Sequence, residues 1–180
     1  MKNKFWIIMA VLMFFTTQAN ALPITALLVD NPNIMVGDQF SVEVRVDNDV
    51  MGEELLAFGF DLQGVDPLLN YVGANIGPAF LDTSFGVNNV AGLAFPGVTD
   101  TDILFATLVF DALDVGVAQI AVEGIFDGFF SGMFYEFSGF DIAAQTSVVI
   151  SQRPPAVPEP AGLFIAGLIL FMCIRKRPFN

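Results

Sequence analysis

The clearest hydrophobic pattern in the chain is a strict alternation over residues 39–46, which read QFSVEVRV. Every second side chain is apolar, and the side chains between them are polar or charged. A period of two is typical of a β-strand with one buried and one solvated face. Residues 56–62 repeat this pattern, so we expect Leu56 and Phe58 to point inward and Asp61 to point outward.

Weaker apolar runs predict further strands between clusters of turn-forming residues. No part of the chain between its two ends shows a sustained helical period. Segment 73–89 has a weak pattern and should be irregular, and Pro96-Gly97 is a predicted turn. Short strands at a spacing of about 8–12 residues predict an all-β fold, either a β-sandwich or a jelly roll. The additional strands are expected at residues 24–29, 68–72, 90–95, 103–110, 117–122 and 146–150.

The segment 124–141 is unusually rich in phenylalanine and glycine. We predict a hairpin region here, with turns at Asp127-Gly128 and Ser131-Gly132. Phenylalanines more often belong to a hydrophobic core. However, the part from Phe129 to Phe140 holds too many rings for one buried face, so some rings should be exposed. Exposed rings would favour binding of a sugar or of a protein partner.

The N-terminus has the three parts of a secretory signal peptide. Lys2 and Lys4 precede an uninterrupted apolar run that ends at Phe15. Ala19 and Ala21 then give the small-x-small pattern that signal peptidase recognises. The pattern predicts a signal helix in residues 1–21 and cleavage directly after Ala21. The alternative is an N-terminal membrane anchor that is retained.

The C-terminal segment, residues 158–180, also has three parts in a fixed order. It opens on the motif Pro158, Glu159 and Pro160. An uncharged apolar run over residues 161–174 follows, which as a helix would span roughly 21 Å of the ~30 Å hydrocarbon core of a membrane. A basic cluster closes the segment and could extend the span by snorkelling: Arg175, Lys176 and Arg177. Its charge predicts that this end stays in the cytoplasm.

This order of motif, short transmembrane helix and basic cluster resembles the PEP-CTERM sorting signal. Proteins with that signal are substrates of exosortase, a membrane-embedded enzyme of Gram-negative bacteria. The resemblance implies export, temporary anchoring in the inner membrane, and cutting near Pro158-Glu159-Pro160. It also implies delivery to the cell surface or to an extracellular matrix such as that of a biofilm. The alternative is an ordinary hydrophobic tail anchor.

The charge of the chain is concentrated between these two ends. The sequence has 7 basic and 19 acidic residues. Only Arg45 and Arg153 remain basic in residues 22–157, against eighteen acidic residues, which gives a formal charge of −16. Such a surface should repel nucleic acid and anionic lipid, and it suits cations or a basic partner. The chain has no histidine, and its single cysteine, Cys173, lies in the tail, so the body can form no disulfide.

The middle of the chain resembles the cohesin-like module, a jelly-roll sandwich. The resemblance rests on Val36-Gly37-Asp38 before the alternating strand, on residues 58–62 and on residues 104–110. It implies a β-sandwich domain over residues 22–150, followed by a linker at 151–157. Cohesins bind dockerins through one sheet face. No residue of this sequence carries that specificity over, so dockerin binding is not expected.

Paired carboxylates give the one candidate metal site, a weak calcium site. Residues two apart on a strand share a face, and calcium prefers six to eight oxygen ligands. The simpler interpretation is a set of acidic loop ends on a soluble surface. The candidate ligands are Asp47, Asp49, Asp100 and Asp102.

These features predict a non-enzymatic exported protein, handled by signal peptidase and an exosortase-type enzyme. It would act as a structural or adhesive component with a polysaccharide or protein partner. The alternative is a secreted carbohydrate-active enzyme that uses paired carboxylates. A cleft with two carboxyl groups of raised pKa would favour the enzyme, and an acidic surface with exposed aromatic rings would favour the binding protein.

Overall fold

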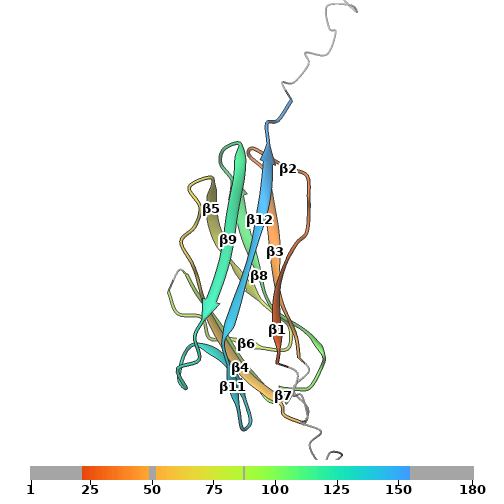
Figure 1. Ribbon diagram of the computed structural model, residues 1–180, viewed down its shortest axis with the longest axis vertical. Helices are drawn as coiled ribbons and strands as arrows, with labels where there is room; N and C mark the ends of the chain where they lie inside the picture. The colour runs from red at the N-terminus through yellow and green to blue at the C-terminus, as the bar shows by residue number, and fades with distance from the viewer. Residues whose placement is uncertain (1–21, 49–51, 87, 155–180) are drawn as a thin grey trace, which may run out of the picture.

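The computed structural model describes residues 22–48, 52–86 and 88–154, and these residues form a sandwich of two β-sheets (Figure 1). The predicted all-β fold is confirmed, because no helix occurs in these three ranges. The strands are β1 (Ile24–Val29), β2 (Ile34–Met35), β3 (Gln39–Asp47), β4 (Leu55–Leu62), β5 (Leu69–Ile76), β6 (Leu81–Asp82), β7 (Asn89–Val98), β8 (Asp102–Ala112), β9 (Gly116–Gly124), β10 (Gly132–Tyr135), β11 (Gly139–Phe140) and β12 (Ile142–Ser151).

The first sheet contains four strands in the order β1-β3-β8-β5. Strand β3 pairs antiparallel with β8 along its whole length, from Gln39 opposite Asp111 to Asp47 opposite Asp102. The alternation predicted from the sequence is confirmed, since Phe40, Val42, Val44 and Val46 are buried.

The second sheet is built around β4. One edge of β4 pairs with β7, which in turn pairs with the short strand β6. The other edge is shared: β10 pairs with Leu55–Gly59, and β9 pairs with Asp61 and Leu62. On its other edge, strand β9 pairs antiparallel with β12. Two successive strands therefore pair with the same edge of β4. The end of β9 pairs with it first, and after the loop of residues 125–131 the chain pairs with it again as β10.

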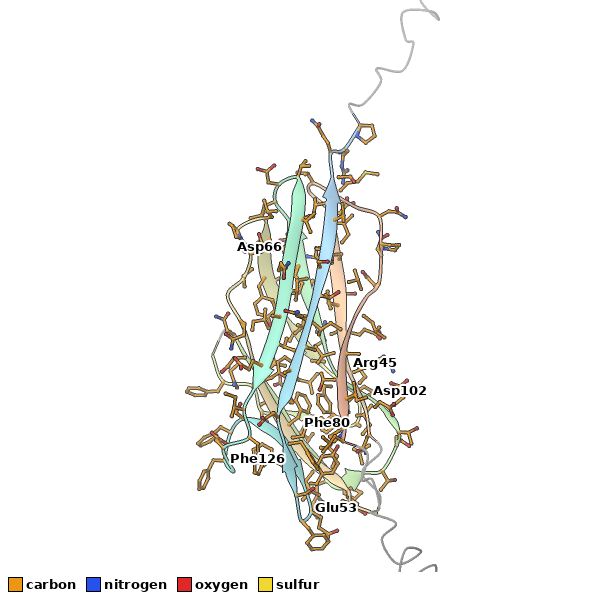
Figure 2. All side chains as sticks on the ribbon, viewed as in Figure 1. Arg45, Glu53, Asp66, Phe80, Asp102 and Phe126 are labelled. Atoms are coloured by element: carbon orange, nitrogen blue, oxygen red, sulfur yellow. The ribbon has the colours of Figure 1, made fainter. Side chains whose placement is uncertain are left out.

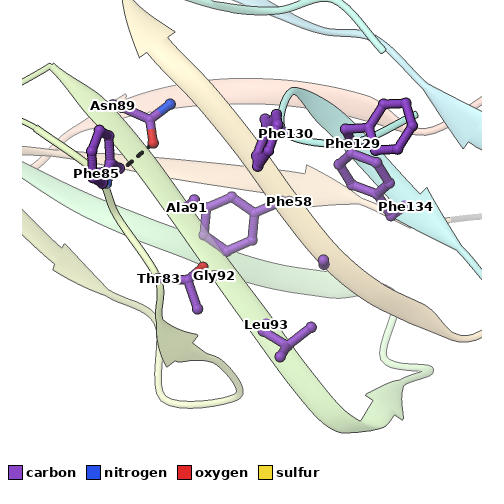
Figure 3. Close-up of a pocket in the computed structure, with 11 residues that line it drawn as sticks. Phe58, Thr83, Phe85, Asn89, Ala91, Gly92, Leu93, Phe129, Phe130 and Phe134 are labelled. Carbon is purple, nitrogen blue, oxygen red and sulfur yellow. Dashed lines mark hydrogen bonds between the residues drawn. The ribbon is translucent and has the colours of Figure 1, made fainter. Parts of the chain in front are cut away.

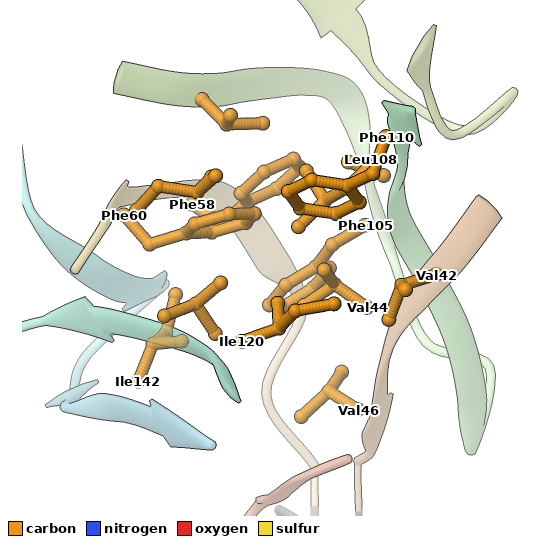
Figure 4. Packing of buried hydrophobic residues seen from close by; sticks show 14 of the residues in the cluster. Val42, Val44, Val46, Phe58, Phe60, Phe105, Leu108, Phe110, Ile120 and Ile142 are labelled. Atoms are coloured by element: carbon orange, nitrogen blue, oxygen red, sulfur yellow. The ribbon is translucent and has the colours of Figure 1, made fainter. Parts of the chain in front are cut away.

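Phenylalanine rings fill the space between the two sheets (Figures 2 and 4). Phe58 of β4 stacks on Phe105 of β8, with ring centroids 4.3 Å apart and planes 2° from parallel. Phe80 meets both rings edge-on. Burial of each such ring contributes about 1.5–3 kcal/mol, so this cluster joins the sheets more strongly than any polar contact of the sandwich.

Two strand predictions are wrong in detail, because bulges change which residues face inward. Leu55, rather than Leu56, is buried, since β4 shifts register against β7 between Leu55 and Ala57. The predicted turn at Pro96-Gly97 lies inside β7, in the segment that bulges at this shift. Sequence periodicity cannot locate a bulge, because the inserted residue breaks the period that the prediction relies on.

Two further segments are more regular than expected. Segment 73–89, predicted to be irregular, contains the end of β5 and the strand β6. Segment 124–141 does form a hairpin, but its turn lies at residues 136–138 between β10 and β11. Asp127-Gly128 belongs to the loop that precedes the hairpin, and Gly132 begins β10.

The predicted signal helix and the predicted transmembrane helix at 161–174 lie outside the described residues. Within the described ranges, no helix has the length and apolar character needed to cross a membrane.

A candidate binding groove on the outer face of the second sheet

A groove of about 860 Å³ lies on the outer face of the second sheet, over β4 and β7 (Figure 3). Its lining is almost entirely apolar and contains no titratable side chain. The lining residues are Ala57, Phe58, Thr83, Phe85, Asn89, Ala91, Gly92, Leu93, Phe129, Phe130 and Phe134.

Small residues form the floor of the groove. Ala57 of β4 is paired with Leu93 of β7, and Ala91 of β7, which is paired with Gly59, lies two residues before Leu93. On a strand, residues two apart share a face, so these outward positions form a shallow platform between larger side chains. The apolar floor follows from the sequence of β4, in which Phe58 and Phe60 point to the core and the outward positions on either side of Phe58 are the small residues Ala57 and Gly59.

The loop of residues 125–131 forms one wall of the groove, and Asp127 fixes its shape. Its Oδ1 atom accepts hydrogen bonds from the backbone N–H groups of Phe129 (2.8 Å), Phe130 (2.8 Å) and Ser131 (3.2 Å). These donors stabilise the ionised carboxylate and hold the pKa of Asp127 below its usual value. A second carboxylate, Asp141, accepts a hydrogen bond from the N–H of Phe126 at 2.7 Å.

Gly59 allows this loop to lie close to the sheet. A Cβ atom at Gly59 would come within 2.1 Å of the carbonyl oxygen of Phe130. Such a distance is far below van der Waals contact, so any larger residue would push the loop away from β4. Gly132 has φ of +99° and sits against Phe126, which lets the chain turn back into β10.

The segment after β6 forms the opposite wall. Phe85 donates its backbone N–H to Oδ1 of Asn89 at 3.3 Å (Figure 3). The side-chain amide of Asn89 donates in turn to Oδ1 of Asp61 at 3.0 Å. The N–H of Ala91 donates to Oγ of Ser84 at 3.1 Å. These bonds, all of which involve a side chain, join the segment to β7 and β4 and fix the backbone position of Phe85.

The aromatic walls are exposed to solvent, as the phenylalanine-rich sequence predicted. Phe129 and Phe130 are each 80% exposed, and Phe85 is 86% exposed. Phe134 packs against Phe126, with ring centroids 5.2 Å apart. Sequence reasoning identified the rings after residue 124 but missed Phe85, which lies in the segment expected to be irregular. The signal it overlooked was a large aromatic residue among small and polar ones.

A buried polar contact lies near the same end of the sandwich. Asn48 is only 5% exposed, and its Oδ1 atom accepts a hydrogen bond of 2.7 Å from the hydroxyl of Tyr135. Burial, assisted by the charge of Glu53, raises the pKa of Tyr135 to about 12. Glu53 also accepts a 2.7 Å hydrogen bond from the hydroxyl of Ser138. These bonds connect the β10–β11 hairpin to Asn48 and Glu53, which both lie between β3 and β4 in the chain.

The structure brings only part of the predicted calcium site together. Asp47 and Asp102 are cross-strand partners. However, Asp102 forms an ion pair of 2.8 Å with Arg45 (Figure 2), and the backbone carbonyl of Asp100 accepts a hydrogen bond from Asn48. Asp49 lies outside the described residues. Among the residues with described positions, no three acidic, histidine or cysteine side chains are grouped to hold a metal, and calcium binding stays a prediction.

Both basic residues of the body are engaged away from the groove. Arg45 pairs with Glu43 and Asp102, and Arg153 pairs with Asp38. Within the described ranges no cation therefore reaches the rim of the groove. The predicted processing residues, including Ala19, Ala21 and the tail from Pro158 to Arg177, lie outside those ranges.

Solved structures similar to this fold are cohesin modules. A cohesin module from a family 33 glycoside hydrolase of Clostridium perfringens matches with a TM-score of 0.56 at 8% identity, covering 73% of this chain and 100% of its own. A non-cellulosomal cohesin from Archaeoglobus fulgidus matches with 0.50 at 12% identity, covering 80% and 98%. A type III cohesin module from the ScaE cell-surface anchoring scaffoldin of Ruminococcus flavefaciens matches with 0.50 at 13% identity, covering 72% and 87%.

The fold is a cohesin-like β-sandwich. No protein-family model matches the chain, and no curated protein matches its sequence. At such low identity the likeness concerns the fold alone, so the binding properties of this chain must be argued from its own groove.

Proposed function

We propose that this protein is an exported binding module that attaches to a partner through the aromatic groove. The observation that carries the proposal is the exposure of Phe85, Phe129 and Phe130 around an apolar floor. Large exposed apolar patches on a folded surface are typical of interaction sites. The two walls are held by Asp127 and Asn89, so the groove is formed before any partner arrives, which lowers the entropic cost of binding.

The groove supports binding better than catalysis. Its lining has no acid, base or nucleophile other than the hydroxyl of Thr83. A glycosidase would need two carboxyl groups facing each other across a cleft, one of them with a raised pKa. The pKa values of the exposed Asp82 and Asp127 are instead lowered by hydrogen bonds. The carbohydrate-active enzyme is therefore the less supported alternative.

The binding proposal is tested by removing rings from the walls. The change combines Phe129→Ala with Phe130→Ala in the full protein, and binding of the labelled, exported product to host cell surfaces or isolated matrix is measured. Loss of both rings should weaken binding about tenfold or more, because aromatic anchors carry much of the energy of an interface.

The matched control combines Phe95→Ala with Phe137→Ala. These two rings are 93% and 79% exposed but do not line the groove. The control should bind like the wild type. An equal loss of binding in both double variants would indicate non-specific adsorption through exposed rings and would refute the groove as the binding site.

We further propose that the tail delivers the module to the surface as a sorting signal. The proposal is supported by the order of motif, apolar run and basic cluster in residues 158–180. If the processing enzyme recognises the carboxylate of Glu159, Glu159→Gln should slow release from the membrane about ten- to a hundredfold. Leu168→Val keeps the apolar run and should be processed normally. Intact-mass analysis of membrane and medium fractions measures both, and a wild-type protein that keeps its full tail would refute the proposal.

A further inference from the structure

Two acidic side chains stand opposite each other at one end of the groove. Asp61 of β4 is the cross-strand partner of Glu123 of β9, and both are exposed on the outer face. Side chains directly opposite on neighbouring strands lie about 4.5–5.5 Å apart at Cβ, and like charges there are destabilising. Neither carboxylate forms an ion pair within the described ranges, where the only ion pairs belong to Arg45 and Arg153. The pair is thus a fixed concentration of negative charge without a cation.

The acidic pair lies between two hollows of the same sheet face. On one side is the aromatic groove, connected to the pair through the hydrogen bond from Asn89 to Asp61. On the other side is a smaller hollow of about 400 Å³ whose lining includes Gln63, Glu123 and Gln145. The path from β7 across β4 and β9 to β12 crosses three strand spacings, about 14 Å. An extended peptide covers that distance with roughly four to five residues.

We propose that the groove and the acidic pair form one site for a short peptide segment that carries an aromatic or aliphatic side chain next to a lysine or arginine. This inference rests on the proposed binding function and names the chemistry of its partner. The apolar side chain would enter between Phe85 and Phe130, and the cation would neutralise Asp61 and Glu123. An arginine or lysine at that position would relieve the like-charge repulsion that the free protein carries.

The lining of the groove argues against a polysaccharide. Sugar hydroxyl groups need several convergent hydrogen-bonding partners, and the polar side chains of the lining are only Thr83 and Asn89. Both ends of the Asn89 amide are already engaged, with the N–H of Phe85 and with Asp61. Charge argues against the other apolar partners. A body with a formal charge of −16 repels both an anionic membrane and a second copy of itself.

The test uses three fluorescent synthetic peptides of six residues and the full protein as it is exported. One peptide alternates phenylalanine with lysine, the second alternates phenylalanine with glutamate, and the third alternates serine with lysine. Anisotropy titrations at low and at physiological salt measure their affinities. The phenylalanine–lysine peptide should bind most tightly, by at least tenfold over either of the others, and should weaken as salt rises.

Variants separate the two halves of the site. Asp61→Asn combined with Glu123→Gln should weaken binding of the phenylalanine–lysine peptide about tenfold, while Asp114→Asn, an acidic loop residue outside both hollows, should not. The double variant should melt at the same temperature as the wild type or slightly higher, because it removes a repulsion. A double variant that loses stability and affinity together would assign the acids a structural role and overturn the proposal.

The remaining outcomes distinguish this inference from the proposed function. Equal binding of the lysine and glutamate peptides, with loss only in the Phe129→Ala and Phe130→Ala variant, would overturn the charge requirement and leave the groove as a purely apolar site. If no peptide binds, the peptide class is wrong. Binding to anionic or zwitterionic phosphatidylcholine-based vesicles in place of the peptides, or concentration-dependent dimerisation, would assign the groove to a membrane or to a second copy.

Discussion

The outer faces of the two sheets differ in whether their side chains bond to one another or remain exposed to solvent. On the first sheet, polar side chains bond to one another. Asp111 accepts hydrogen bonds from the amides of Gln39 (3.0 Å) and Asn70 (3.3 Å), and Arg45 joins Glu43 to Asp102. On the second sheet, the face over β4 and β7 has small residues on its floor and exposed rings on its walls.

This difference indicates which face can gain free energy by contacting a partner. Polar groups that already have partners gain little from a new contact, because the existing hydrogen bonds must be exchanged. Exposed rings gain the full benefit of removal from water. The groove on the second sheet is therefore the face that we propose as the site of interaction.

Phenylalanine should contribute strongly to stability in the core and very little to stability in the groove. Phe105 is fully buried between the sheets, so Phe105→Ala should lower the free energy of unfolding by about 3–5 kcal/mol. Phe129 is 80% exposed, and Phe129→Ala should change it by less than about 0.5 kcal/mol. Urea denaturation measures both. Similar losses would mean that the loop rings contribute to folding, which would contradict the contrast.

Gly59 should be required for the shape of the groove. Gly59→Ala places a methyl group against the carbonyl oxygen of Phe130, and relief of this clash should cost about 1–3 kcal/mol and displace the loop. The amide resonances of residues 127–131 report the displacement. In the control, Gly52→Ala meets no atom within 4 Å but has a φ of +81°, so it should lose stability through backbone strain alone. Unchanged loop resonances in Gly59→Ala would exclude the clash.

The hydroxyl of Tyr135 should stabilise the groove end of the sandwich. Tyr135→Phe leaves the buried Oδ1 of Asn48 without this donor, at a cost of about 1–3 kcal/mol. Because the pKa of Tyr135 is raised to about 12 from its ordinary 10.0, the unfolded chain loses this proton first. The contribution is complete below about pH 10 and is lost as the pH rises toward 12. Urea denaturation across this range should show a weaker decline in Tyr135→Phe, and identical declines would exclude Tyr135 as the titrating group.

Asp127 should control the loop with little effect on the whole fold. Its pKa is lowered by the three backbone donors, so the loop contribution is present above the ordinary aspartate pKa and is lost as the pH falls through the lowered value. Asp127→Ala should broaden or shift the amide signals of Phe129 and Phe130 at neutral pH. Asp114→Asn is the control. Unaltered signals in Asp127→Ala would show that the loop holds its shape without the carboxylate.

Calcium should have the smallest effect. If the acidic pairs around Asp47 and Asp100 bind the ion weakly, the body should melt at a slightly higher temperature with calcium than with chelator, at matched ionic strength. Equal melting temperatures would contradict calcium binding to the folded body.

The sequence predicted those parts of the fold in which a single period continues without interruption. Strand β1 has the expected bounds, and β3 has the expected inward face, because alternation alone determines which side chains are buried. The errors occur where the register shifts. Leu56 and Pro96 were misplaced because the bulge between β4 and β7 depends on long-range pairing that no local pattern encodes.

For the groove, the sequence predicted the type of side chain but not the location of the site. An excess of rings after Gly124 predicted exposed aromatic residues, and this prediction is confirmed. Its location depends on the pairing of Ala57 with Leu93 and on the close approach of Phe130 to Gly59, which join segments far apart in the chain. The opposition of Asp61 and Glu123 likewise arises from strand pairing across the sheet.

The described chain enters the sandwich at one end and leaves it at the other (Figure 1). Strand β12 starts beside the groove, where Ile142 faces Gly124, and ends at Ser151 beside β2, about 30 Å away along the strand. Tension between a partner in the groove and an anchor beyond Pro154 would therefore act parallel to the strands. The hydrogen bonds between β9 and β12 would be sheared together and would not open one after another. We expect the module to resist stretching and to hold its partner as a stiff spacer.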